Sequence, residues 1–143
     1  MGEPWPQDRT DAPVDLLRRE SRSLVQRLRL WTPARYAAAA PPWGTRGDLV
    51  LHLAQACADA AADLDGGPRR TVPRLDSELG LADQLAVTSD DLVRAGPGDD
   101  LARAATAHLL VHRSDLLGED VPTSLARALG VQDVVALGRA ACG

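Results

Sequence analysis

The stretch Ala107-His108-Leu109-Leu110-Val111-His112-Arg113-Ser114-Asp115-Leu116 sets two histidines four residues apart in a segment with helical hydrophobic spacing. Residues four apart lie one above the other on a helix, so His108 and His112 present two imidazoles on one face. One metal ion can bridge such a pair. The small residues Ala104 and Ala105, one turn earlier, leave room for a ligand or a close neighbouring helix. The stretch predicts a helix that carries a candidate metal-binding pair.

The third histidine lies on a second predicted helix. This segment begins at Trp43 and continues Gly-Thr-Arg-Gly-Asp-Leu-Val-Leu to His52. Thr45 is the expected N-cap and Asp48 completes a capping-box pattern, and an apolar stripe runs on to the Gly66-Gly67-Pro68 stop. His52 falls at the border of that stripe. Three ligands from two helices would leave coordination positions open, as in catalytic rather than structural metal sites.

The remaining segments also have helical spacing, and no alternating strand pattern is present. Helices are predicted over residues 14–30, 79–95 and 99–117, with short ones after Thr32-Pro33 and from Thr123, while residues 69–77 form a loop. Asp99 or Asp100 is the expected cap of the helix over 99–117, and Thr123 that of the last helix. These elements predict an all-α four-helix bundle with an additional C-terminal helix. Residues 1–13 form an extended or disordered lead-in, and residues 14–143 form a single domain.

Composition narrows the function classes. The net charge of −4 argues against a general nucleic-acid binder. We interpret the basic series Arg18, Arg19, Arg22, Arg27 and Arg29 as a solvated helix face. The sequence has no bilayer-length apolar run and no signal-peptide pattern, which predicts a cytoplasmic protein that binds no membrane. Cys57 and Cys142 form no disulfide framework, and both are expected to be reduced.

All 16 basic residues are arginine. This bias is typical of a very GC-rich genome and suggests an actinobacterial source. The apolar last helix is compatible with a homodimer.

Set side by side, His52 and the His108/His112 pair resemble the DinB-like superfamily, and within it the metal-binding domains of mycothiol-dependent maleylpyruvate isomerases. Two motifs carry the resemblance: Trp43 to His52, and Val111-His112-Arg113-Ser114-Asp115-Leu116 with Gly118 close behind. The match spans roughly residues 16–129. The chain departs from this branch at His108, where the isomerases have a glutamate. Three histidines instead resemble bacillithiol-transferase-like members and the metal domains of ergothioneine-type sulfoxide synthases.

The resemblance implies a bundle that holds one divalent metal ion through His52, His108 and His112, with no catalytic residue beyond these ligands. Zinc is the first expectation, with nickel or Fe(II) as alternatives, since a neutral three-histidine set suits each of them. The expected activity is a transferase or isomerase reaction between a low-molecular-weight thiol, mycothiol as co-substrate, and a small-molecule electrophile. The metal would activate the thiol as the thiolate. No binding residues for the thiol are assigned.

Several alternatives stay open at this stage. A histidine pair on a helix is often a surface or core feature, and the chain can be a bundle without metal. It can also be a non-catalytic metal- or ligand-binding accessory module or sensor, which the lack of a second domain favours. Asp115 either orients a histidine or caps the helix end. Trp43 either anchors the start of its helix or forms a wall of the site.

Overall fold

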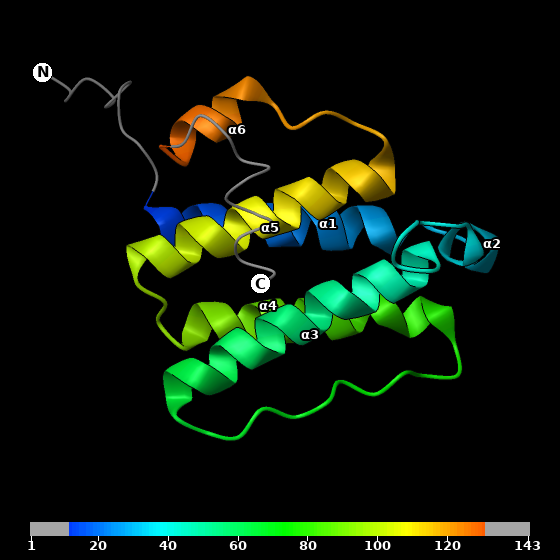
Figure 1. Ribbon diagram of the computed structural model, residues 1–143, viewed down its shortest axis with the longest axis horizontal. Coiled ribbons are helices and arrows are strands. Elements are labelled where there is room, and N and C mark those ends of the chain that lie inside the picture. Colours follow the sequence, from blue (N-terminus) through cyan, green and yellow to red (C-terminus); the bar gives the residue numbers. More distant parts are fainter. Residues whose placement is uncertain (1–11, 131–143) are drawn as a thin grey trace, which may run out of the picture.

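The computed structural model describes residues 12–130, which are all-α with no strand. Four long helices and three short ones follow in order: α1 (Pro13–Leu28), α2 (Pro33–Ala37), α3 (Arg46–Asp65), the 3-10 helix η1 (Glu78–Gly80), α4 (Leu81–Arg94), α5 (Asp99–Leu117) and α6 (Thr123–Ala128). The long helices pack into a bundle, with α6 beside α5 and α2 at one end (Figure 1). The predicted four-helix bundle with an added C-terminal helix is confirmed.

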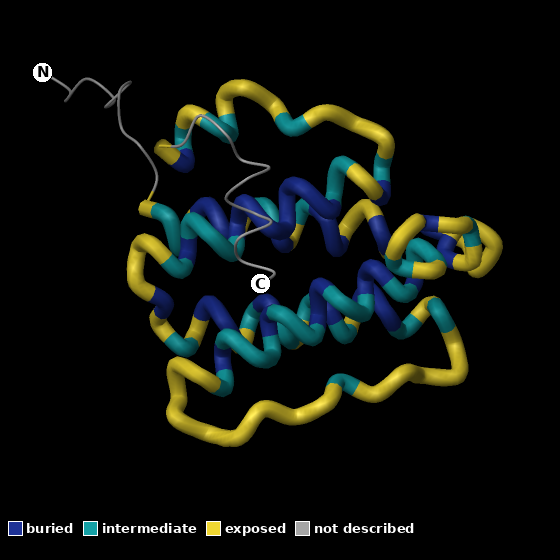
Figure 2. The backbone as a smooth tube through the Cα atoms, in the orientation of Figure 1, coloured by how far each residue is buried: buried dark blue, intermediate teal, exposed yellow. Residues whose placement is uncertain are grey.

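Each long helix packs mainly against two others. α1 lies against α4 and α5, and α3 lies against the same two helices, so α1 and α3 are diagonal to each other. The seam between α3 and α5 has the sparsest contacts of the four. Figure 2 shows the buried positions on the inward faces of these helices, while the long loop from α3 to η1 is exposed. The loosest seam of the bundle therefore lies between the two helices that carry the histidines.

Local sequence explains where most helices begin and end. Thr45 and Asp48 form the predicted capping box of α3, and Gly66 ends that helix in the left-handed conformation at φ 72°. Two expected caps are wrong. Gly98, not Asp99 or Asp100, is the N-cap of α5. Both aspartates lie in the first turn, where a carboxylate interacts favourably with the helix dipole. Pro122, not Thr123, precedes α6.

The core is built from aliphatic side chains of the four long helices, with few aromatics. Its centre includes Leu24, Leu49, Leu85 and Leu109, each at most 1% exposed. Cys57 belongs to this core, and burial raises the pKa of its thiol to about 12. The thiol is therefore protonated and inert at neutral pH.

Some predictions fall outside the described residues. Most of the lead-in over residues 1–13, the last part of the domain predicted over 14–143, and Cys142 lie there. Within residues 12–130, no helix combines the length and apolarity that a bilayer span requires.

Candidate metal centre

All three histidines of the chain meet in one cluster between α3 and α5. One ligand nitrogen from each of His52, His108 and His112 lies within 4.8 Å of the other two. The ring centroids of His108 and His112 are 4.5 Å apart, and that of His52 lies 5.4 Å from His108 and 5.6 Å from His112. The rings face one another at steep angles rather than stacking, so their edges converge.

Helix geometry explains this convergence. His108 and His112 are one turn apart on α5 and are both 5% exposed, so the pair faces inward. His52 is half-buried at the edge of the apolar face of α3. Its border position lets the ring reach across the loose α3–α5 seam toward the pair. The predicted grouping of the three residues is present in the structure.

Burial disfavours the charged form of one of the three imidazoles, that of His52. Burial lowers the pKa of His52 below its ordinary value of 6.5, which favours the neutral imidazole. Neutral imidazole is the form that binds metal ions. The site therefore holds at least one histidine in the state ready for coordination.

The donor set fits a divalent metal ion. Zinc binds imidazole nitrogens at about 2.0–2.1 Å, which places tetrahedral ligand atoms about 3.3 Å apart. A separation of at most 4.8 Å requires the most distant pair to close by about 1.5 Å or less, a distance that side-chain rotation covers. Three imidazoles leave at least one coordination position for another ligand. The cluster can thus hold a metal ion in an open site.

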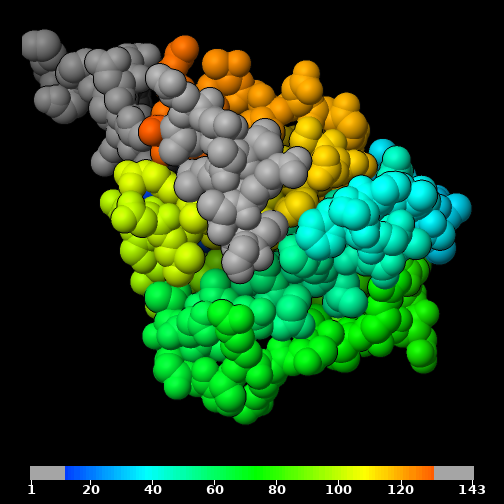
Figure 3. Space-filling view, in the orientation of Figure 1, coloured from blue at the N-terminus to red at the C-terminus, as the bar shows by residue number. Residues whose placement is uncertain are grey.

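Trp43 packs directly on the cluster. Its ring lies 4.3 Å from that of His52 and 5.2 Å, edge-on, from that of His112. In the space-filling view the cyan segment that includes α2 and the start of α3 lies against the yellow end of α5 (Figure 3). The indole is partly exposed, so one side of it forms a wall of the histidine cluster while another faces solvent.

A tight turn positions Trp43. The Trp43 amide donates to the Ala40 carbonyl at 2.8 Å, and the Ala40 amide donates to the Gly44 carbonyl at 2.9 Å. Gly44 has φ 102°, and a Cβ there would overlap the carboxylate of Asp48. The turn therefore requires glycine beside the capping box of α3. This geometry ties the position of the indole to the start of the helix that carries His52.

Asp115 lies near the cluster but is not part of its buried centre. Its Oδ2 is 3.6 Å from Nδ1 of His112, longer than a hydrogen bond, and the side chain is 56% exposed. Asp115 does not cap the end of α5, where Gly118 in the left-handed conformation supplies the C-cap. Orientation of His112 by a small movement of Asp115 remains a prediction.

The sequence left open whether Trp43 anchors its helix or forms a wall of the site, and the indole packs on the cluster. Its simultaneous contact with α5 was not predicted, since nothing in the chain relates Trp43 to that helix. A second feature that the sequence did not predict is the environment of Arg113, whose side chain is only 18% exposed and approaches Glu119 at 3.7 Å. Glu119 also accepts a hydrogen bond from Arg27 at 2.9 Å, so these residues link α1 to the end of α5. In the sequence, only the position of Glu119, just beyond Gly118, indicated a possible partner for these arginines.

Comparison with known proteins returns no match to a family model, a curated protein or a solved structure. The class of protein is therefore defined by fold and site alone. It is an all-α bundle with a buried three-histidine cluster that can hold a metal ion.

Proposed function

We propose that this protein is a metal-dependent enzyme of the DinB-like type that transfers a low-molecular-weight thiol to a small electrophile. One observation carries the proposal: every histidine of the chain, from two helices distant in sequence, converges on one largely buried point. Random surface histidines would not converge in this way. Coordination of one metal ion by His52, His108 and His112 accounts for the convergence.

The chemistry follows from the donor set. A divalent ion on three neutral imidazoles keeps its full charge and would stabilise a thiolate, the nucleophilic form of a thiol, at neutral pH. His52, His108 and His112 hold that charge in place, and His52 is kept neutral by burial. Trp43 covers one side of the cluster through its contacts with His52 and His112. No side chain of the protein need act as nucleophile, and Cys57 is excluded from this role by its burial and raised pKa.

The proposal also specifies the thiol and the class of electrophile. Mycothiol is the proposed co-substrate, through the resemblance of the Trp43–His52 and Val111–Leu116 motifs and the arginine-only composition. An activated alkene or an epoxide is the proposed class of acceptor, since both accept a thiolate at carbon without an oxidant. In the addition, the sulfur–carbon bond forms, and the proton released by the thiol ends on the carbon or oxygen that receives the electron pair.

The first experiment measures metal content by mass spectrometry on protein purified without a histidine tag. The parent is compared with His112→Ala and with Arg103→Gln, a matched surface control on the same helix. Near-stoichiometric zinc, nickel or iron in the parent and the control, with little in His112→Ala, supports the metal centre. No metal in any of the three proteins, even after reloading, would overturn it.

The second experiment tests the reaction. Metal-loaded protein is incubated with mycothiol and a panel of alkenes and epoxides, and loss of free thiol is followed. Thiol consumption that requires metal and is lost in His112→Ala supports the transferase. Stoichiometric metal without turnover across the panel would reject the transferase and leave a metal-binding accessory module or sensor.

A further inference from the structure

A groove of about 320 Å³ runs between α1 and α4, on the seam diagonally opposite the histidine cluster. Its floor is formed by short side chains where the two helices pack. They are Ser21 and Val25 on α1 and Ala86, Ser89 and Val93 on α4. Longer residues at these positions would fill the space, so the groove follows directly from the local sequence. Its volume lies at the lower end of the range for small-molecule sites.

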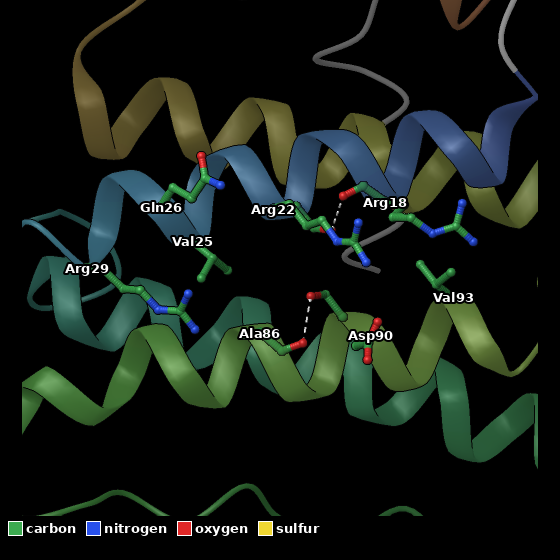
Figure 4. A pocket seen from close by; sticks show the side chains of 10 residues that line it. Arg18, Arg22, Val25, Gln26, Arg29, Ala86, Asp90 and Val93 are labelled. Carbon is green, nitrogen blue, oxygen red and sulfur yellow. Dashed lines mark hydrogen bonds between the residues drawn. The ribbon is translucent and has the colours of Figure 1, made fainter.

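The rim of the groove is rich in arginine. Arg18, Arg22 and Arg29 all line it and follow one face of α1 at helical spacing, and Asp90 is the acidic residue of the lining. Figure 4 shows Arg22, Val25 and Arg29 directed from α1 toward α4, while Gln26 points away from the gap. The lining thus carries an excess of positive charge, although the whole chain has a net charge of −4.

Arg22 differs from the other charged residues of the groove. Arg18 is paired with Asp15 at 2.6 Å and Arg29 with Asp83 at 3.1 Å. Asp90 is paired with Arg94 at 2.9 Å. Arg22 forms no ion pair with any carboxylate of residues 12–130. The uncompensated cation therefore lies at the middle of the arginine row, above the apolar floor.

The floor of the groove determines which kind of chemical group can lie beside Arg22. Val25 and Val93 are buried and apolar, at 4% and 8% exposed. The hydroxyls of Ser21 and Ser89 donate to carbonyls of their own helices, those of Arg18 and Ala86, at 3.1 and 3.2 Å. Because these donors are already used, the floor favours an apolar group over a polar one. The groove joins an apolar slot to a guanidinium, and a guanidinium binds carboxylates bidentately.

We propose that the α1–α4 groove binds a small organic carboxylate, with its apolar body over Val25, Ala86 and Val93 and its carboxylate on Arg22. The row of arginines on α1, interpreted from sequence as a solvated face, is in this proposal the rim of a ligand site. The site is separate from the histidine cluster and does not depend on a metal ion.

The test titrates hexanoate into full-length, metal-stripped protein labelled with ¹⁵N, and follows amide shifts in Tris buffer at constant ionic strength. Hexanol is the neutral probe of the same length, and chloride is the simple anion. We expect saturable hexanoate shifts centred on residues 18–29 and 86–93, with neither hexanol nor chloride reproducing them. Removing one charged hydrogen-bonding partner should weaken hexanoate binding roughly tenfold or more in Arg22→Gln.

Two further variants make the result decisive. Ala86→Leu fills the floor and should also weaken hexanoate binding, while Arg103→Gln removes an arginine on α5 outside the groove lining and should leave binding unchanged. Circular dichroism confirms that each variant is folded. Equal loss in Arg103→Gln, equal shifts from hexanol or chloride, or an absence of shifts at the groove would each overturn the proposal.

Discussion

The indole of Trp43 lies 4.3 Å from the imidazole of His52, with the two rings tilted by 33°. The same indole meets His112 edge-on. A single residue that precedes α3 therefore contacts candidate ligands on both α3 and α5. The histidine cluster is consequently closed on one side by a residue whose position depends on the turn before α3. This relationship makes Trp43 a natural reporter of the site.

Nickel or cobalt binding at the cluster should quench Trp43 fluorescence. Both ions are paramagnetic, and the indole contacts two of the three histidines. We expect saturable quenching in the parent and its loss in Trp43→Phe. Trp31→Phe, which changes the tryptophan that contacts Tyr36, should retain it. Equal quenching in the parent and Trp43→Phe would place the ion elsewhere.

Replacing Trp43 should also weaken metal binding. Side chains that pack on metal ligands and orient them typically change metal affinity by roughly 10–100-fold when mutated. We expect Trp43→Ala to show a loss of this order in competition with a zinc chelator, with a milder loss in Trp43→Phe, which keeps an aromatic wall. An unchanged zinc affinity in Trp43→Ala would show that the contact only packs the turn.

Metal should stabilise the fold. An ion that binds the folded state but not the unfolded state adds about 2.7 kcal/mol at a free concentration of 100 times Kd. Thermal unfolding of the parent should therefore shift upward with zinc and return to its starting point with chelator. His52→Ala should show no zinc-dependent shift, because the cluster contains no other residue from α3. A zinc shift as large as that of the parent would contradict the proposed ligand set.

The capping box of α3 should make the free energy of unfolding depend on pH in the acid range. Asp48 accepts from the Thr45 amide at 2.9 Å and pairs with Arg74, and these contacts hold the pKa of its carboxyl below the ordinary value of 3.8. A carboxyl with a lowered folded-state pKa stabilises the fold above 3.8 and loses that contribution as the pH falls through its folded pKa.

Urea unfolding of the parent and Asp48→Asn tests this contribution. The parent should be more stable at pH 7, and the difference should shrink as the pH falls below 3.8. Asp15→Asn, on an exposed ion pair of α1, serves as the control and should change stability little. A difference that is constant with pH would assign the role of Asp48 to packing rather than charge.

Tyr36 should contribute through one buried hydrogen bond. Its hydroxyl donates to the carbonyl of Leu28 at 2.7 Å, and this contact ties α2 to the end of α1. Tyr36→Phe should cost about 1 kcal/mol, measured by urea unfolding, because the Leu28 carbonyl still accepts from the Trp31 amide and is not left unpaired. A loss above about 3 kcal/mol would indicate that the tyrosine ring repacks.

The sequence predicts those features of the structure that depend on interactions between residues close together in the chain. Hydrophobic spacing predicts the long helices, because burial of one face decides helix formation within the segment itself. The capping box at Thr45 and Asp48 is equally local, and it is present as predicted. The caps of α5 and α6 are not, because Gly98 and Pro122 precede residues that looked like better caps.

The histidine site also has one part that local sequence predicts and one part that depends on tertiary packing. The sequence determined that His108 and His112 share a face, since helical spacing leaves no other arrangement. Only the tertiary structure decided that His52 meets them, since that requires α3 and α5 to be neighbours with a loose seam between them. The contact of Trp43 with both helices and the arginine-rimmed groove between α1 and α4 likewise depend on how helices pack. Packing joins residues that no local pattern relates.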